Sequence, residues 1–362
     1  MSARPSHELT KIRGAASGPC KPVDIFEGDT ARLRHELWRA PVSGHRRKGT
    51  RLSELRAVLG AGITAFAILE PLQSFSVDAD ALNAASFLKE RGFDIAGVTR
   101  GEDGRVIGYV EQRSLTHGQV ADHLRLLTVD HLVADTTPLP EVLSFLKERA
   151  FAFVLVGSEV EGIVTRADLN KPPVRVYLFG LISLLEMHMG HWIRSEYEGE
   201  SWKVHLTEGR LSAAVNRQEE RRKRNQDIDL VECLQFCDKR DLILQSDALR
   251  KSLGLGGKNA GARFLKRAEA LRDLLAHSQQ DLVEGTSWEE LIDLVEGLEV
   301  VLERSDDLME ATTSRRADHQ SADDQSADRQ GVDHHSADRQ SADYQSSEEL
   351  RGKRGTESDG PP

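Results

Sequence analysis

An eight-residue segment occurs twice in this chain, as SFLKERGF at 86–93 and as SFLKERAF at 144–151. Seven of the eight positions are identical, and the copies lie 58 residues apart. Each copy is followed by an apolar run, a glycine-containing turn and a second apolar run. This order predicts helix, strand, tight turn, strand and helix in both copies. Because one short sheet cannot bury both faces alone, we expect the copies to pack as one domain with a cleft between them.

The second copy ends in GIVTRADL at 162–169. This pattern of Gly, two apolar residues, Thr, two further residues and Asp resembles the ending of each repeat in a CBS-domain pair. The resemblance implies an α+β pair of β-α-β-β-α repeats, at about 60–116 and 124–171 within a domain at 51–173. In that family, the Thr and Asp line a cleft that binds AMP, ATP or S-adenosylmethionine.

By this resemblance, Thr165 contacts phosphate or ribose, and Asp168 contacts the ribose hydroxyls. The chemistry agrees, because a carboxylate accepts hydrogen bonds from two neighbouring hydroxyls. A helix N-terminus beside it offers free N–H groups to phosphate, and Arg166 could add a charge-assisted contact. Thr165 and Asp168 also fit a helix N-cap with an acid at its third position, which explains both residues without a ligand.

The first copy departs from this motif. Its ending, GYVEQRSL at 108–115, has Glu111 in place of the Thr and Ser114 in place of the Asp. Glu111 would repel phosphate, and Ser114 is too short to hold two ribose hydroxyls. We therefore predict one competent cleft at most, and a pair that is purely structural or dimerising stays an alternative.

KPP at 171–173 breaks the chain, and an apolar segment at 174–193 follows. Its charged and histidine residues are costly in hydrocarbon, so we predict a buried connecting helix rather than a membrane span. A polar linker then extends to residue 227. We predict no metal site, because His188 and His191 fit packing, and Cys233 and Cys237 fit buried thiols.

Residues 228–304 show a helical pattern that predicts a small all-α bundle. Within it, FLKRAEALRDLLAHS at 264–278 contains Arg272-x4-His277, and SWEE at 287 opens a further helix. This context resembles HEPN domains, whose Arg-x(4–6)-His motif cleaves RNA without a metal. The resemblance implies proton transfer by His277 and transition-state stabilisation by Arg272. The alternative is that both are surface residues at a helix end, since the same spacing occurs elsewhere in the chain.

Both ends of the chain are polar. Residues 1–50 predict a flexible basic arm, and the pentapeptide repeats within 305–362 predict a disordered tail that buries too little apolar surface to fold. The first residues lack an apolar segment, so we expect no secretory signal. Three cysteines form no disulfide framework, which favours a cytoplasmic location. The net charge of -11 argues against general polyanion binding.

Together these features predict a regulatory protein that senses an adenine nucleotide or S-adenosylmethionine and couples its occupancy to the helical bundle. No cofactor is obligatory in this hypothesis, and we expect a homodimer. The first alternative is a metal-independent endoribonuclease of HEPN type that acts on RNA under control of the pair. A weaker alternative is a nucleic-acid-binding regulator that uses the basic runs at 45–51 and 219–224.

Overall fold

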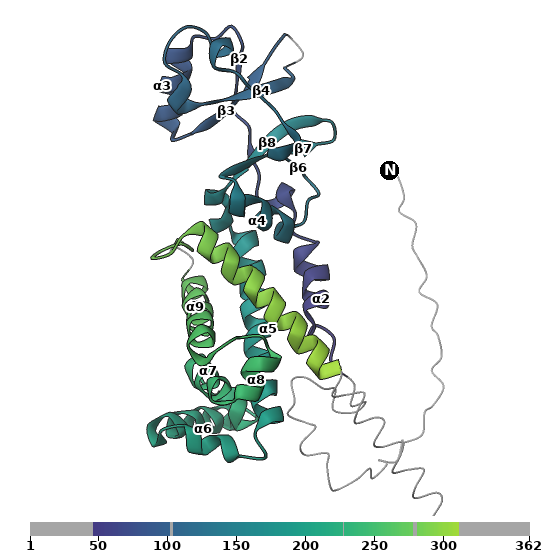
Figure 1. The fold of residues 1–362 in the computed structure, drawn as a ribbon, viewed down its shortest axis with the longest axis vertical. Coiled ribbons are helices and arrows are strands. Elements are labelled where there is room, and N and C mark those ends of the chain that lie inside the picture. Colours follow the sequence, from purple (N-terminus) through teal and green to yellow (C-terminus); the bar gives the residue numbers. More distant parts are fainter. Residues whose placement is uncertain (1–45, 102–103, 227, 278–280, 311–362) are drawn as a thin grey trace, which may run out of the picture.

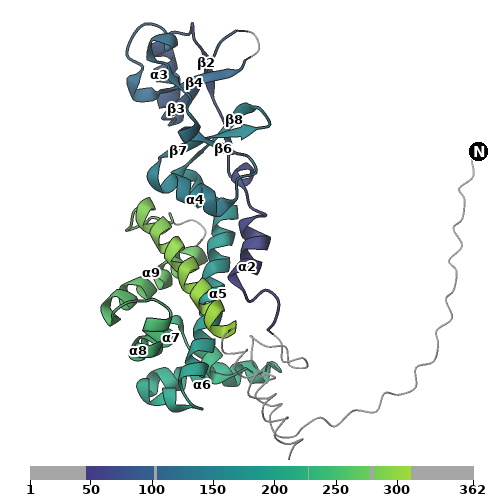
Figure 2. The same ribbon diagram turned by 45° about the vertical axis from the view of Figure 1, so that its right-hand side comes forward.

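The computed structural model describes residues 46–101, 104–226, 228–277 and 281–310. Figures 1 and 2 show an elongated molecule with two small sheets at one end and helices at the other. The first repeat forms the far end, and the second repeat lies between it and the helices. No helix in these ranges combines the length and the apolar character that a bilayer crossing requires.

The two repeats have the same order of elements. The first contains β2 (Ser74–Ser76), α3 (Ala81–Arg91), β3 (Ile95–Thr99) and β4 (Val106–Glu111). The second contains β6 (Leu132–Ala134), α4 (Leu139–Glu148), β7 (Phe151–Val156) and β8 (Glu159–Thr165). In each repeat the first two strands pair in parallel and the last two antiparallel. The helix predicted to close each repeat is a short 3-10 turn, at Gln112–Ser114 and Arg166–Asn170.

The single difference between the repeated segments changes how their helices end. Helix α3 begins at the N-cap Asp80, which accepts a hydrogen bond from the N–H of Asn83 at 2.8 Å, and stops at Gly92 with φ 68°. Glycine adopts this left-handed conformation without a steric cost. The second copy has Ala150 at the equivalent position, and α4 ends instead in an extended residue, Arg149.

The repeats exchange their outermost strands. Strand β1 (Glu70–Pro71) precedes the first repeat but pairs with β8 of the second. Strand β5 (Arg125–Leu126) precedes the second repeat but pairs with β4 of the first. The resulting sheets have the orders β1-β8-β7-β6 and β2-β3-β4-β5. Each four-stranded sheet is therefore completed by a segment that precedes the other repeat.

The helical region is built around α5 (Pro172–Glu196), which runs through its centre (Figures 1 and 2). The other helices are α6 (Glu208–Lys223), α7 (Phe236–Gln245), α8 (Asp247–Ser252), α9 (Lys258–Ala276) and a helix at 288–310. Helix α2 (Leu52–Leu55) continues as a π-helical turn at Arg56–Gly60 and packs against α5. The helical region therefore takes segments from both sides of the repeats in sequence.

One hydrophobic core continues from the second repeat into the helical region. It joins Leu143 and Leu146 of α4 to Leu181 and Leu185 of α5, and further to helix 288–310. The first repeat has a separate core of its own, around Leu88 and Val110. Packing thus attaches the second repeat to the helices, and the first repeat is attached through the second.

Several predicted boundaries differ from the structure. The helix predicted at 174–193 extends over Pro172–Glu196 and is the centre of the bundle, because its buried residues lie on most of its faces. The predicted polar linker at 194–227 contains the 3-10 turn Ser201–His205, in which Trp202 is buried, and α6, in which Ala214 is buried. Because most of this segment is polar, its sequence pattern did not indicate the few buried residues that attach it to the helical region.

Both predicted tails include residues that are folded. Arg46 pairs with Asp306, and Thr50 is buried, although both 46–50 and 305–310 were assigned to tails. Residues 305–310 continue the last helix, in which Ser305 and Met309 are buried. The predictions for 1–45 and 311–362 lie outside the described residues.

Candidate functional site

The structure brings Thr165 and Asp168 together where β8 ends. The N–H of Thr165 donates to Oδ2 of Asp168 at 2.7 Å, and the Thr165 hydroxyl lies 2.9 Å from the same oxygen. Asp168 stands in the first turn of the 3-10 helix, and the residue is 7% exposed. This is the capping geometry that the spacing predicted. These contacts fix the Asp168 carboxylate next to the last residue of β8.

A lysine that the sequence pattern did not single out completes the polar cluster. The ammonium of Lys171 lies 2.9 Å from Oδ1 of Asp168 and 2.5 Å from Glu70, and it donates to the carbonyl oxygen of Ile68 at 2.6 Å. Burial alone would lower its pKa, but the hydrogen bonds to Glu70 and Asp168 raise the pKa of Lys171. In the sequence, Lys171 was noted only as the first residue of the KPP segment that breaks the chain. Its partner Glu70 lies about a hundred positions earlier.

Aromatic rings from both repeats lie beside this cluster. Phe151 is paired across the sheet with Thr165, so both side chains leave the same face. The Phe151 ring stacks on His131, with centroids 5.6 Å apart and planes 16° apart. Tyr109 of the first repeat packs on both, at 5.7 and 5.5 Å. The alternating positions on β4 and β7 are visible in the sequence, but their meeting across two repeats is not.

Arg166 makes its contacts on the side of the helical region. Its Nε and Nη2 donate to the carbonyl oxygens of Leu146 and Lys147, at 2.9 and 2.8 Å, and so cap the end of α4. Its Nη1 forms an ion pair with Glu289, near the start of helix 288–310. These contacts use three of the five N–H donors of Arg166 and hold its guanidinium on the side of the helical region.

The first repeat has a different arrangement at the equivalent place. Glu111 is buried and forms ion pairs with Arg113, at 2.6 Å, and with Arg125. The Ser114 hydroxyl donates to the carbonyl oxygen of Glu111 at 2.7 Å. These contacts tie Glu111 and Ser114 to the protein itself.

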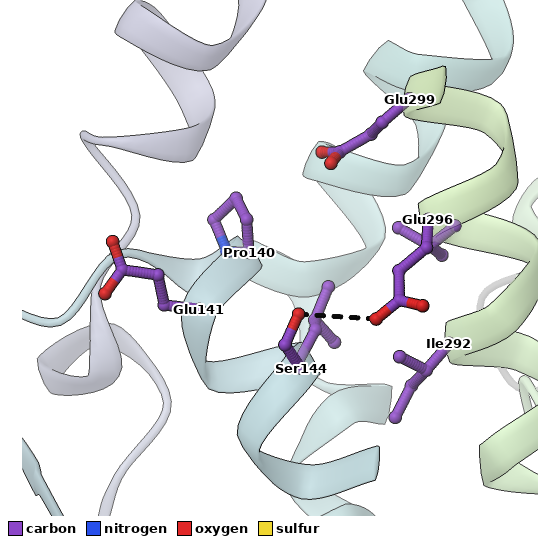
Figure 3. Close-up of a pocket in the computed structure, with 8 residues that line it drawn as sticks. Pro140, Glu141, Ser144, Ile292, Glu296 and Glu299 are labelled. Carbon is purple, nitrogen blue, oxygen red and sulfur yellow. Dashed lines mark hydrogen bonds between the residues drawn. The ribbon is translucent and has the colours of Figure 1, made fainter. Parts of the chain in front are cut away.

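The second repeat also contacts helix 288–310 through α4. The ammonium of Lys147 lies 2.7 Å from both Asp293 and Glu296. Beside these pairs is a hollow of about 280 Å³ between α4 and the last helix. Figure 3 shows Ser144 of α4 facing Glu296 across it, with the hydroxyl 3.4 Å from the carboxylate. Charged contacts thus join the candidate site's repeat to the helical region.

The predicted pair Arg272 and His277 is placed at two different parts of α9. The Nε of Arg272 lies 3.4 Å from Glu186 of α5, whereas His277 is the exposed C-cap of the helix. His277 follows the last residue of α9 and has an extended backbone, with φ -114° and ψ 96°. The Nη1 of Arg175 approaches the carbonyl oxygen of His277 at 3.5 Å. Among the described residues, Arg272 pairs with Glu186 and Asp273, and no hydrogen bond joins its side chain to that of His277.

His188 is a packed, hydrogen-bonded histidine. It is fully buried, its Nδ1 lies 2.8 Å from the Ser305 hydroxyl, and its Nε2 lies 3.0 Å from the carbonyl oxygen of Thr50. Burial lowers the pKa of His188 to about 3. In the ranges that the structure covers, no three His, Cys, Asp or Glu side chains form a group able to hold a metal ion.

No protein-family model matches the sequence, and a search of curated proteins gives no match. Solved structures resemble about a third of the chain. They include CBSX2 in complex with AMP, at 17% identity, covering 32% of this chain and 98% of that one, with TM-score 0.29. The CBS domain of a bacterial CNNM/CorC family Mg²⁺ transporter in complex with ATP has 15% identity, coverage of 35% and 97%, and TM-score 0.28.

A conserved CBS-domain protein of unknown function from Thermoplasma acidophilum has 17% identity, coverage of 35% and 76%, and TM-score 0.27. At these TM-scores, the likenesses carry no argument on what the chain binds. The strand orders described above confirm the predicted fold class, an α+β pair of repeats with mixed sheets followed by a helical region.

Proposed function

We propose that this chain is a regulatory protein whose CBS-type pair binds an adenine nucleotide or S-adenosylmethionine beside Thr165 and Asp168. In this proposal, occupancy of the cleft changes how the second repeat holds the helical region. The observation that carries it is the position of Arg166. It lies between Thr165 and Asp168 in sequence, and its guanidinium reaches Glu289 of helix 288–310.

The polar cluster supports the binding step. A carboxylate offers about four acceptor positions, and Asp168 receives the N–H and hydroxyl of Thr165 and the ammonium of Lys171. A ribose hydroxyl would take the remaining position or displace Lys171. The rings of Phe151 and His131 supply a flat apolar wall next to Thr165, suited to a base or a ribose edge.

The contacts of the second repeat support the coupling step. A phosphate that attracts Arg166 competes with Glu289 for the same guanidinium, so binding and release of the last helix are linked. Lys147 holds that helix at two further carboxylates, Asp293 and Glu296. A ligand changes this equilibrium only as far as its affinity differs between the two arrangements.

A thermal-unfolding series with AMP, ADP, ATP and S-adenosylmethionine tests the proposal. A ligand that binds the folded state stabilises it by about 2.7 kcal/mol at a hundredfold excess over its dissociation constant. We expect one ligand to raise the melting temperature of the wild type and of Ser114→Ala, the matched change in the first repeat. Asp168→Ala should lose that increase. No increase with any ligand would leave Thr165 and Asp168 as a helix cap and would contradict the proposal.

A metal-independent ribonuclease of HEPN type is the second candidate, as a dimer in which two Arg-His pairs share a cleft. The observation that favours it is that Arg272 lines a charged pocket in the helical region. The test is cleavage of single-stranded RNA in EDTA by wild type, Arg272→Gln and His277→Ala. Intact RNA with the wild type, or equal cleavage by His277→Ala, would remove this candidate.

A further inference from the structure

A second pocket lies within the helical region, away from the cleft of the repeats. Its volume is about 440 Å³, and it is bounded by α5, α6, α9 and the start of α7. Three arginines line it: Arg217 and Arg221 of α6 and Arg272 of α9. Pockets of this size are typical of small-molecule sites. We call it the arginine pocket.

The acidic side chains of the arginine pocket have cationic partners that stand outside its lining. Glu232 lies 2.6 Å from Arg194, and Glu269 forms an ion pair with Arg240. Glu186 lies 3.7 Å from the ammonium of Lys239, a residue that is 2% exposed. Because Arg194, Lys239 and Arg240 compensate these carboxylates, and Arg272 approaches Glu186 at 3.4 Å, Arg217 and Arg221 are the lining arginines in excess.

The side chains of the three lining arginines form few hydrogen bonds or close ion pairs within the protein. The Nε of Arg217 donates to the carbonyl oxygen of Cys233 at 2.7 Å, but its Nη2 is buried without a hydrogen-bond partner. Within the described ranges, Arg221 has neither an ion pair nor a side-chain hydrogen bond. Arg272 approaches Glu186 and Asp273 only at 3.4 and 3.5 Å, beyond the usual length of such a bond.

The start of α7 forms a further part of the lining. Gln235, Phe236 and Cys237 line the pocket, and they are the N-cap and first two residues of α7. The first N–H groups of an α-helix have no partner within the helix, and they favour an anion at that end. At this end of α7, Asp238 already accepts from the N–H of Gln235 at 3.1 Å, so the arginines are the main donors of the pocket.

We propose that the arginine pocket binds a small molecule that carries a phosphate monoester. A dianionic phosphate carries more negative charge than a carboxylate and offers three oxygens to several guanidinium groups at once. It would give an acceptor to Arg221, which is exposed and, in the described ranges, has no side-chain partner. This inference does not depend on the cleft at Thr165 and Asp168, because the two sites share no residue.

Titration calorimetry on the full chain tests the proposal with three probes: ribose 5-phosphate, inorganic phosphate and, as the phosphate-free control, ribose. We expect ribose 5-phosphate and phosphate to bind and ribose not to bind. Arg217→Gln and Arg221→Gln should each weaken binding by about tenfold or more, because each removes charge-assisted hydrogen bonds. Lys223→Gln is the matched control, since it removes one charge from α6 outside the pocket lining.

Arg221 is exposed, so its substitution leaves the fold intact even if Arg217→Gln proves unstable. Equal affinity of wild type and Arg221→Gln, or weakening that is equally large in Lys223→Gln, would overturn the proposal. So would loss of binding in Asp168→Ala alone, which would place the phosphate in the other cleft. A single-stranded RNA oligonucleotide bound through Arg217 and Arg221, with no binding of either phosphate probe, would also overturn it.

Discussion

The guanidinium of Arg166 forms an ion pair with Glu289, a residue 123 positions further along the chain. The same side chain caps α4 through the carbonyl oxygens of Leu146 and Lys147. One arginine thus joins the end of β8, the end of α4 and the beginning of the last helix. Of these contacts, Arg166 makes both the ion pair and the capping bonds, whereas Glu289 takes part only in the ion pair. Substitutions of the two residues should therefore change the free energy of unfolding by different amounts.

Arg166→Ala should lower the free energy of unfolding by about 1–3 kcal/mol, because two carbonyl oxygens lose their donors along with the ion pair. Glu289→Gln should have a smaller effect, since its partner keeps both backbone contacts and Glu289 is largely exposed. Urea unfolding of both variants measures the difference. An equal loss in the two would mean that the backbone contacts of Arg166 add no stability.

Tyr177 on α5 supports a second prediction. This fully buried residue donates its hydroxyl to Glu299 of the last helix, and Glu299 also pairs with Arg56 at 2.8 Å. Burial and this bond to Glu299 raise the pKa of Tyr177, so the hydroxyl remains a donor at ordinary pH. Tyr177→Phe should lower the free energy of unfolding by about 1–2 kcal/mol.

Urea unfolding at pH 7.5 measures this loss. The double variant Tyr177→Phe with Glu299→Gln serves as a control, because removing the carboxylate charge should recover part of the cost. No loss in Tyr177→Phe would show that water replaces the hydroxyl.

His188 predicts a dependence of stability on pH. A carbonyl oxygen can only accept, so Nε2 carries the proton donated to Thr50, and Nδ1 accepts from the Ser305 hydroxyl. The pKa of His188 is lowered by burial to about 3, below its ordinary value of 6.5. Between these values the unfolded chain binds the proton and the folded chain does not. Stability from this residue is therefore complete above pH 6.5 and is lost as pH falls towards 3.

We expect the free energy of unfolding attributable to His188 to fall by about 2.7 kcal/mol between pH 7.5 and pH 4.5, two pH units below the ordinary pKa. Urea unfolding at several pH values measures this fall. His188→Gln should have a shallower slope over the same range, because its amide does not titrate. Parallel slopes for wild type and His188→Gln would contradict the prediction, and the carboxylates would then account for the whole dependence.

The segment before the first repeat predicts where the chain can be shortened. Residues 46–60 supply the pair of Arg46 with Asp306, the acceptor Thr50 for His188 and the buried Leu52. A chain that starts at residue 61 should lose at least about 3 kcal/mol, because an apolar site is opened and a buried imidazole loses its acceptor. A chain that starts at residue 46 keeps these contacts and is the control. Equal melting temperatures for the two would contradict this assignment.

The local pattern of the sequence was sufficient to predict both repeats and the meeting of Thr165 with Asp168. Identity between 86–93 and 144–151 identified equivalent helices, and short spacing brought Thr165 and Asp168 into contact. The exchanged strands could not be predicted in this way. Strands β1 and β5 are two residues long and too short to show an alternating pattern.

Contacts between distant segments were missed for a related reason. Near the candidate site they involve the charged residues Lys171, Glu70 and Glu289. The sequence does not indicate which distant residue a charged side chain will contact. The same holds for α6, whose few buried residues lie among many charged ones. The arginine pocket depends on four helices meeting, so neither composition nor spacing indicated it.

The exchange of β1 and β5 makes the two repeats one unit in folding, although they are two units in sequence. A single repeat expressed alone would keep its helix and central strands but would expose an unpaired edge at β4 or β8, a surface that invites aggregation. Neither repeat is a module that can be transplanted by itself. Unfolding of either repeat therefore removes a strand from the sheet of the other.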